Sequence, residues 1–348
     1  MKSVSRSIVV ASATVALASF ALACSGKNVS SGFEATDGGG GFGTGTGSGS
    51  GTGNNGNGNL GNGSGDAGQG TGGSVQVIYA HTDTELYSMD PTTHAVTDIG
   101  PFQINGSTPS DAITDLAVDA EGSVWVNTET DVYRASLPSS PGPVALTLET
   151  STSGNHKFYA LGFAPAGFLG SAEALIAGDD EGELWYINTS SANSTPQDLG
   201  GFGTNGNGDT WELSGDLVFY TQNGTATGLA TIRTCSSSKS DCGKSNDYLA
   251  AVDMTALQQA FTSGTPGSLL KGTYGSGTGY GELFGLGAWG NAAYGFAREQ
   301  SNTPAQLIQI DGTTGVGTSL QQFPNITSGW SGAGVTTKAV ISVPQPNN

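Results

Sequence analysis

The sequence is poor in basic residues, with 11 Lys and Arg among 348 residues against 29 Asp and Glu. A surface that binds nucleic acid needs clustered Lys and Arg to neutralise phosphates, so nucleic acid is not an expected partner. Removing residues 1–23 takes away two basic groups and no acidic group, which leaves 9 basic and 29 acidic residues and a formal charge of −20. This acidity favours solubility of the remaining chain.

Histidine is scarce, and no nucleophile motif of the form G-x-S-x-G occurs. His81, His94 and His156 are the only histidines, and they have no carboxylate or cysteine at ligand spacing. A strand or surface position is therefore favoured over a catalytic or metal-binding role, and the sequence predicts no metal site and no cofactor. One acidic cluster, residues 179–183 (DDEGE), indicates a hairpin turn, with a calcium loop as the alternative.

Long apolar runs are confined to the beginning of the chain. Lys2 and Arg6 precede IVVASATVALASFALA, the run from Ile8 to Ala23. Its 16 residues fall short of the roughly 20 that a helix needs to cross a membrane. Positive charges followed by a short apolar run are typical of a secretory signal, so we expect residues 1–23 to direct export.

The end of that run resembles a bacterial lipoprotein signal. Small or aliphatic residues, Ala21, Leu22 and Ala23, stand before Cys24, although such signals more often carry the Leu one place earlier. The resemblance implies cleavage before Cys24 and lipidation of its sulfur and of the new N-terminus, and several acyl chains anchor a protein stably. Ser25 in place of Asp implies an outer-membrane or cell-surface location. An ordinary signal peptide cleaved elsewhere is the alternative.

Two further cysteines, Cys235 and Cys242, flank the Ser-rich segment CSSSKSDC. In an exported protein such a pair predicts a local disulfide, since the compartment is oxidising. No C-x2-C spacing and no neighbouring His suggest a zinc site instead.

Glycine dominates the segment after the signal. Residues 38–73 contain 19 glycines among 36 residues, and only Phe42 and Leu60 are sizeable apolar groups. Such a segment cannot bury enough surface to fold, so we expect a disordered stalk over residues 24–74 with a reach of about 40 Å. The folded domain is expected over residues 75–348.

A strand that ends in a small polar or acidic residue recurs five times in that domain. The five copies are LYSMD (86–90), VYRAS (132–136), LWYIN (184–188), LAAVD (249–253) and LIQID (307–311). Further strand-like runs flank each copy in the same order; in the fourth copy the two preceding runs are TWELSG (210–215) and LVFYTQ (217–222). The spacings of 46, 52, 65 and 58 residues fit one four-stranded sheet per repeat.

The two ends of the repeat region are incomplete in a complementary way. The first copy has no opening strand, and SGWSGAGVTT (328–337) looks like an opening strand without a continuation. Joining them resembles the closure of β-propellers, so the expected fold is an all-β propeller of five four-stranded blades in which a C-terminal strand completes the first blade. One helix, residues 253–264, is expected in a loop of the fourth blade.

Residues on or beside the opening strands are the candidates for function, because these strands face the channel of a propeller. The carboxylates there are Asp115, Asp119, Glu212, Asp216 and Glu282, and any two of them could converge. Three tryptophans, Trp211, Trp289 and Trp330, are binding candidates, since indole rings stack on sugars and anchor protein contacts. Filling the core is the alternative role for these rings.

The sequence thus predicts a monomeric lipoprotein, anchored to a membrane by its lipid, whose propeller binds a glycan or protein ligand. An enzymatic role is less favoured. The alternative function is a carbohydrate-active hydrolase that uses two channel carboxylates, because glycoside hydrolysis needs a pair of them about 5 to 10 Å apart. Propellers host both classes, so the fold alone does not decide between them.

Overall fold

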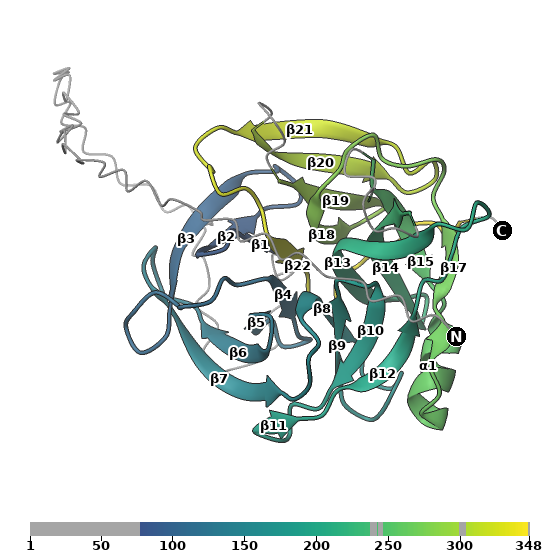
Figure 1. Cartoon of the computed structure of the whole chain (residues 1–348). Helices are drawn as coiled ribbons and strands as arrows, with labels where there is room; N and C mark the ends of the chain where they lie inside the picture. The colour runs from purple at the N-terminus through teal and green to yellow at the C-terminus, as the bar shows by residue number, and fades with distance from the viewer. Residues whose placement is uncertain (1–76, 237–241, 243–245, 299–303, 347–348) are drawn as a thin grey trace, which may run out of the picture. The chain divides into compact units, whose positions relative to one another are not determined.

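The computed structural model describes residues 77–236, 242, 246–298 and 304–346, all of which fall in the unit Leu60–Asn348. Cys24 and the Gly-rich segment lie outside the described residues. The described part is built almost entirely from antiparallel strands, which form five four-stranded blades around one axis (Figure 1). The predicted β-propeller with five blades is confirmed.

Each blade runs from an innermost strand at the axis to an outermost strand at the rim (Figure 1). The first blade consists of β22 (Gly332–Gly334), β1 (Ile78–His81), β2 (Glu85–Met89) and β3 (Val96–Gln103). The second consists of β4 (Asp115–Val118), β5 (Val124–Asn127), β6 (Asp131–Ser136) and β7 (Val144–Thr152). The third consists of β8 (Phe158–Ala164), β9 (Ala174–Asp179), β10 (Glu183–Ile187) and β12 (Gln197–Gly201).

The fourth blade consists of β13 (Thr210–Gln222), β14 (Thr225–Cys235), β15 (Tyr248–Val252) and β17 (Leu270–Thr273). The fifth consists of β18 (Leu283–Trp289), β19 (Ala292–Ala297), β20 (Ala305–Asp311) and β21 (Gly317–Phe323). Two short strands join neighbouring blades at the rim: β11 (Asn193–Ser194) pairs with β7, and β16 (Gly267–Ser268) pairs with β12. The repeated segment of the sequence forms the third strand of every blade, as predicted.

The ring closes where the sequence predicts it. β22 pairs antiparallel with β1, so residues near the C-terminus supply the inner strand of the first blade. Figure 1 shows β22 at the centre, among the innermost strands of the other blades. A second link lies at the rim, where β3 pairs in parallel with β7 of the next blade. The closure leaves β1 without an exposed inner edge.

The fourth blade departs from the prediction. TWELSG and LVFYTQ were expected as separate strands, but both belong to β13, and ATGLATIRTC supplies the second strand. The hairpin turn is Asn223-Gly224, whose positive φ values of 49° and 77° suit a two-residue turn. The chain around Gly215 forms an irregularity in the pairing between Leu213 and Leu217 and not a turn. The Asn-Gly pair was the stronger turn signal in the sequence.

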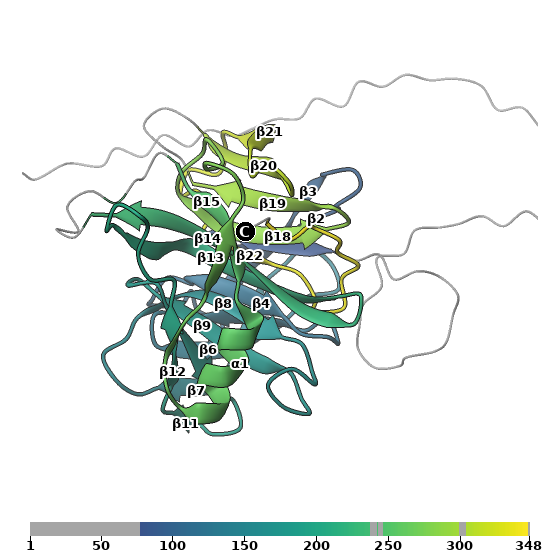
Figure 2. The same cartoon turned by 90° about the vertical axis from the view of Figure 1, so that its right-hand side faces the viewer.

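Apolar side chains fill the spaces between adjacent blades. One cluster lies between the first and second blades around Leu116 and Phe102, and another between the second and third around Trp125 and Phe163. Two larger clusters pack the fourth blade against the third and the fifth blade against the first. Figure 2, viewed from the side, shows the blades stacked face to face in this way. Because strands are covered on both faces, their sequences are apolar on both faces.

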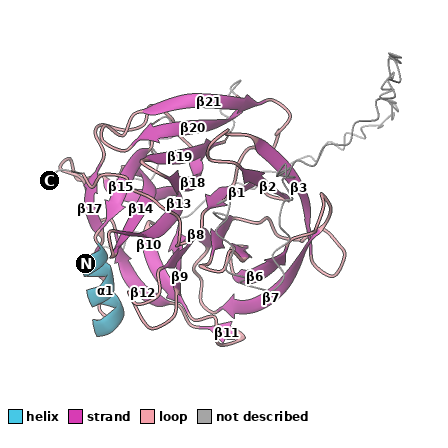
Figure 3. Cartoon of the chain, turned by 180° about the vertical axis from the view of Figure 1, so that it is seen from behind, coloured by secondary structure: helices cyan, strands magenta, loops and turns pink. Residues whose placement is uncertain are grey.

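The predicted helix forms as α1 (Met254–Ser263). The Asp253 side chain caps its N-terminus by accepting from the backbone N–H groups of Thr255 and Ala256, and Gly264 ends it in the left-handed conformation. Although the helix follows a strand of the fourth blade, it packs beside β12 of the third, as Figure 3 shows at the rim. The reason is β16, which follows the helix and pairs with β12. Within the described ranges, no helix is long and apolar enough to cross a membrane.

Deleting residues 328–348 tests the closure. The deletion removes β22, so the inner edge of β1 and the apolar faces beside it become exposed. We expect the truncated chain to aggregate or to become sensitive to proteases. Limited proteolysis and size-exclusion chromatography of the purified chain measure this.

The matched control is deletion of residues 38–73, the Gly-rich segment that the sequence predicts to be a stalk. A segment without a core contributes no packing, so this deletion should leave the melting temperature nearly unchanged. Equal behaviour of the two deletions would contradict the role of β22.

Candidate ligand-binding site

Two carboxyl groups meet at the axis of the propeller. Asp115 begins β4 and Asp216 lies in β13, and both side chains are fully buried. Asp115 Oδ2 accepts a hydrogen bond from the backbone N–H of Leu161 at 2.6 Å. Asp216 Oδ2 accepts from the backbone N–H groups of Leu286 at 2.6 Å and Ala333 at 3.2 Å. Each carboxyl therefore joins its own blade to the inner strand of another blade.

Burial shifts the pKa of both axial carboxyls in the same direction. Burial raises the pKa of both well above the ordinary value of Asp, and the charge of Asp216 raises the pKa of Asp115 further. Asp216 is stabilised as the carboxylate by its backbone donors and by a hydrogen bond from Asp115. The two carboxyls therefore titrate as a coupled pair, and both favour the protonated form more than an exposed Asp does.

The histidines occupy three unrelated positions. His81 is fully buried in β1; its Nδ1 lies 2.7 Å from the Thr82 carbonyl oxygen, and burial lowers its pKa to about 4. His94 Nε2 lies 3.4 Å from the Tyr294 hydroxyl. His156 is an exposed residue whose ring lies 4.0 Å from that of Trp185. His81 is neutral at physiological pH, since its folded pKa lies far below 7.

A cavity of about 770 Å³ opens at the end of the axis where the turns between the second and third strands of the first three blades lie. All five blades contribute to its wall. One lining residue from each blade, in order, is Asp83, Thr114, Tyr159, Ser214 and Phe284. The volume is within the range of about 300 to 1,000 Å³ typical of small-molecule sites.

Carboxylates outnumber cations in the wall of this cavity. Six carboxylates line it, namely Asp83, Asp111, Glu129, Asp179, Asp180 and Glu282. Two arginines, Arg233 and Arg298, line it as well. The wall also contains several hydroxyl groups, so the part of the cavity formed by the described residues is polar and carries a net negative charge.

Two of these carboxylates are paired with cations at the solvent-exposed part of the wall. Asp83 pairs with Arg298 at 3.4 Å and accepts a hydrogen bond from the Ser331 hydroxyl. Glu129 pairs with the ammonium group of Lys157 at 2.6 Å and accepts from the Tyr159 hydroxyl at 2.7 Å. The strong bonds of these two carboxylates fix the wall of the cavity on the first, second and third blades.

Asp247 lies beneath the part of the cavity formed by the fourth blade. Its side chain is buried, and its Oδ2 accepts from the Ser214 hydroxyl and, at 2.8 Å, from the backbone N–H of Leu283. Burial raises the pKa of Asp247 to about 7, against the opposing effect of these hydrogen bonds and of the positive charge of Arg233. Ser214 and Arg233 line the cavity directly above it.

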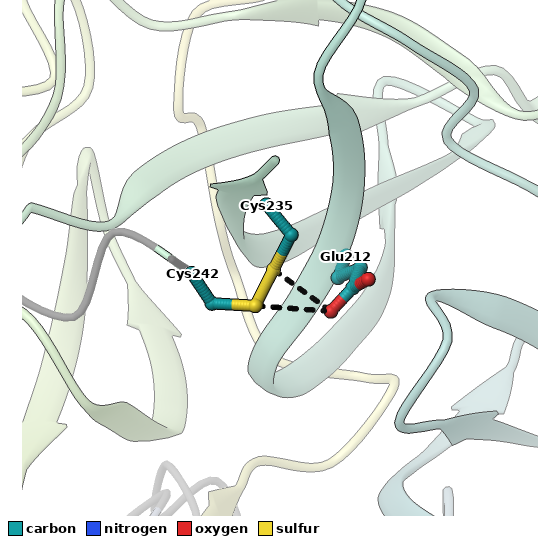
Figure 4. Close-up of a disulfide and its surroundings, with 3 residues drawn as sticks. All are labelled: Glu212, Cys235 and Cys242. Carbon is teal, nitrogen blue, oxygen red and sulfur yellow. Dashed lines mark hydrogen bonds between the residues drawn. A yellow bond between two sulfur atoms is a disulfide. The ribbon is translucent and has the colours of Figure 1, made fainter. Parts of the chain in front are cut away.

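The predicted disulfide is confirmed. Cys235 and Cys242 are bonded at the end of β14, where they close the loop that leads to β15. One carboxylate oxygen of the buried Glu212 lies 2.8 Å from Cys235 Sγ and 3.7 Å from Cys242 Sγ (Figure 4). Donor atoms of these three residues lie within 4.8 Å of one another, but in the disulfide the sulfurs bond to each other and are not free to hold a metal ion.

The predicted carboxylates separate into different roles. Asp115 and Asp216 converge at the axis, Glu282 lines the cavity, and Glu212 lies beside the disulfide. Asp119 lies in the turn between β4 and β5, where it accepts from the indole N–H of Trp125 at 3.1 Å.

The acidic cluster of residues 179–183 forms a turn of the same kind between β9 and β10. Asp179 Oδ1 accepts from the backbone N–H groups of Glu181 and Glu183, and its Oδ2 accepts from the indole N–H of Trp185 at 2.9 Å. Asp119 and Trp125 show the same spacing of six residues. An Asp followed six residues later by a Trp therefore marks a turn of this kind, and both pairs are visible in the sequence.

The three tryptophans proposed for binding do not line the cavity. Trp330 is fully buried and meets the rings of Tyr87, Phe296 and Phe323 edge to face. Trp211 is 9% exposed and packs edge to face against a neighbouring ring, and Trp289 is partly buried beside the core. Their role in binding stays a prediction, with packing as the function that their contacts support.

Comparison with known proteins gives likeness of fold without a family. No known protein family matches the sequence, and no curated protein matches it. A protein of unknown function from Bacteroides caccae is 9% identical, with 75% of this chain and 99% of that chain covered and a TM-score of 0.41. The Dos1 propeller is 11% identical, with 68% of this chain and 55% of that chain covered and a TM-score of 0.34.

A second protein of unknown function, from Bacteroides thetaiotaomicron, is 13% identical, with 78% of this chain and 61% of that chain covered and a TM-score of 0.38. The chain thus spans about half the length of the Dos1 chain and nearly all of the B. caccae chain. At such low similarity, the five-blade assignment rests on the strand pairing described above.

The raised pKa of Asp247 predicts a pH dependence of stability. Between about pH 4 and pH 7 the folded state holds a proton on Asp247 that the unfolded state has lost, so the free energy of unfolding falls as pH rises. The loss from this group is at most about 1.4 kcal/mol per pH unit and ends above pH 7, where both states are ionised. Urea unfolding at pH 5, 6, 7 and 8, followed by tryptophan fluorescence, measures it.

Asp247→Asn provides the control. The amide keeps the shape and an acceptor oxygen but does not titrate, so the variant should lose less stability than the native chain between pH 5 and 7. Equal slopes for both proteins would contradict the assignment to Asp247, because the axial carboxyls contribute the same slope to each.

Proposed function

We propose that this chain is an exported, lipid-anchored binding module that holds a ligand in the axial cavity of its propeller. One observation carries the proposal: a polar cavity of about 770 Å³ to which every blade contributes residues. A site built from all five blades is rigid, because each part of its wall is held by a separate sheet. Rigid sites lose little conformational entropy on binding, which favours affinity.

The axial carboxyls favour a structural role over a role in glycoside hydrolysis. A glycosidase needs two carboxyls with room between them for a sugar and, in inverting enzymes, a water. Asp115 and Asp216 instead contact each other, are fully buried, and accept backbone N–H groups of three other inner-strand residues. Their arrangement supports a structural role, so we keep hydrolysis as the second candidate only.

The anchor is proposed from the sequence, where the export segment ends at Cys24 and a Gly-rich stalk follows. A lipid on Cys24 would hold the propeller at the outer membrane or cell surface, and the stalk would let the cavity move over tens of ångströms. We propose that the module acts as a monomer whose partners are the membrane and the ligand.

Replacing Cys24 by Ser tests the anchor. The serine cannot form the thioether, so the protein should move from the washed membrane fraction to the soluble fraction. Immunoblotting of both fractions measures the shift. Continued sedimentation of Cys24→Ser with membranes, together with no effect of blocking lipoprotein processing on the native chain, would refute lipidation.

Filling the cavity tests the binding function. Ala112 and Thr130 are exposed residues of the cavity wall, so Ala112→Trp with Thr130→Trp should obstruct the cavity without disturbing the core. We expect the full chain, solubilised in mild detergent, to capture glycan or protein from cell-surface material. The double variant should lose that capture.

Val316→Trp is the control, because it adds an indole ring at an exposed position between β20 and β21, outside the cavity wall. Capture that is identical for the native chain, the double variant and the control would place any binding outside the cavity. The melting temperatures of all three proteins establish that each is folded.

A further inference from the structure

Two buried polar atoms of the fourth blade have no hydrogen-bond partner among the described residues beside the cavity. They are Nε of Arg233 and Oδ1 of Asp247. Arg233 lines the cavity, and the buried Asp247 feels the charge of Arg233. Buried polar groups are nearly always paired in proteins, so a neighbouring donor and acceptor without partners indicate that something else satisfies them.

Arg233 differs in this respect from the other cations near the cavity. Arg298 is paired with Asp83, and Lys157 is paired with Glu129. No described carboxylate forms an ion pair with Arg233, although six carboxylates line the same cavity. Arg233 is held in β14, opposite Glu212 of β13, so its position is fixed by the sheet. An arginine fixed in a cavity and left unpaired is available to a ligand.

Ser214 also lines the cavity, and its hydrogen-bonding capacity is opposite to that of Arg233. The hydroxyl of Ser214 donates its only proton to Asp247, so its oxygen can only accept from a ligand. The guanidinium of Arg233 can only donate. The fourth blade therefore presents a fixed acceptor and a fixed donor to the same cavity.

The chemistry of the whole wall selects among ligand classes. Among the described residues carboxylates outnumber arginines in the wall, which disfavours an anionic ligand, whereas Arg233 disfavours a cation only at its own position. A hydroxyl group donates and accepts at once, so it can bond to Ser214, to Arg233 and to the carboxylates without a charge of its own. Phe284 and Tyr159 add ring surface to the wall, which suits the apolar face of a sugar.

We propose that the axial cavity binds a neutral, polyhydroxylated ligand, a sugar or short glycan, through the Arg233 guanidinium and the Ser214 oxygen. This inference rests on the proposed binding function and names the ligand class of that same cavity. Asp247 acts on Ser214 as a positioning residue. The alternative occupant, a peptide segment, is an outcome of the test below.

The test is an array that carries four probe sets: neutral oligosaccharides, oligosaccharides with uronic acids, oligosaccharides with free amines, and peptides of mixed sequence. The full chain in mild detergent should bind neutral oligosaccharides. Arg233→Ala removes the donor, and its affinity for them should fall about 10- to 100-fold, the usual loss for a hydrogen bond to a charged group. Arg233→Lys, which keeps the charge but lacks Nε, should also lose affinity.

Arg134→Ala is the matched control, since Arg134 is a half-exposed arginine of β6 that pairs with Glu149 and lies outside the cavity. It should bind as the native chain does, and thermal melting should show that each variant is folded. The role of Arg233 would be overturned if Arg233→Ala still bound neutral glycans while the cavity-filling double variant did not.

Other outcomes separate this inference from the binding function itself. Binding confined to peptides or to charged oligosaccharides, and lost in the cavity-filling variant, would overturn the ligand class and leave the binding function standing. Binding to none of the four probe sets would overturn the ligand class as well. The binding function itself would be contradicted by a different result: filling the cavity would leave the capture of cell-surface material unchanged.

Discussion

The innermost strand of each blade presents backbone N–H groups to an axis where no further strand can pair with them. Asp115 and Asp216 solve this problem for the described propeller. Asp216 accepts from the inner strands of the fifth and first blades, and Asp115 accepts from that of the third. Burial raises the pKa of both carboxyls, which lets them lie side by side, since two charges in contact there would repel strongly. The closed ring depends on this pair.

The same constraint explains the glycines of the inner strands. A Cβ on Gly332 would lie 2.1 Å from Asp115 Oδ1 and 2.3 Å from His81 Nε2, and a Cβ on Gly215 would lie 2.3 Å from Phe284 Cα. Both positions therefore need glycine for close approach. Because β22 must pass this close to the carboxyl of Asp115, ring closure by the C-terminal strand and burial of the axial pair are one packing event.

Periodic features of the sequence predicted the fold well, but the sequence predicted little of the site. The repeat LYSMD to LIQID marked the third strand of every blade, and the incomplete first copy revealed the closure. The fourth blade was divided wrongly, because TWELSG and LVFYTQ were taken as separate strands although Gly215 between them serves close packing. Packing of distant strands is not visible in a local pattern.

The cavity residues lacked any such pattern. Arg233 is one residue in a strand, and Asp247 follows a loop, so nothing in their spacing relates them to Ser214. Tertiary contacts alone bring the three together. Tryptophan attracted attention by its size, but size equally suits a core, and Trp330 lies there under three aromatic rings. Asp115 and Asp216 were among the candidates because inner strands face the axis, which is a property of the fold.

The fourth blade is where structure and proposed function meet. Beyond the pairing irregularity at Leu213, β13 and β14 continue as a two-stranded extension in which Thr210 faces Cys235 and Glu212 faces Arg233. An isolated two-stranded ribbon is only marginally stable, and a covalent link at its end limits fraying. The disulfide lies at that end and Ser214 and Arg233 lie at its base. The disulfide therefore restrains the end of the two strands that present the donor and the acceptor to the cavity.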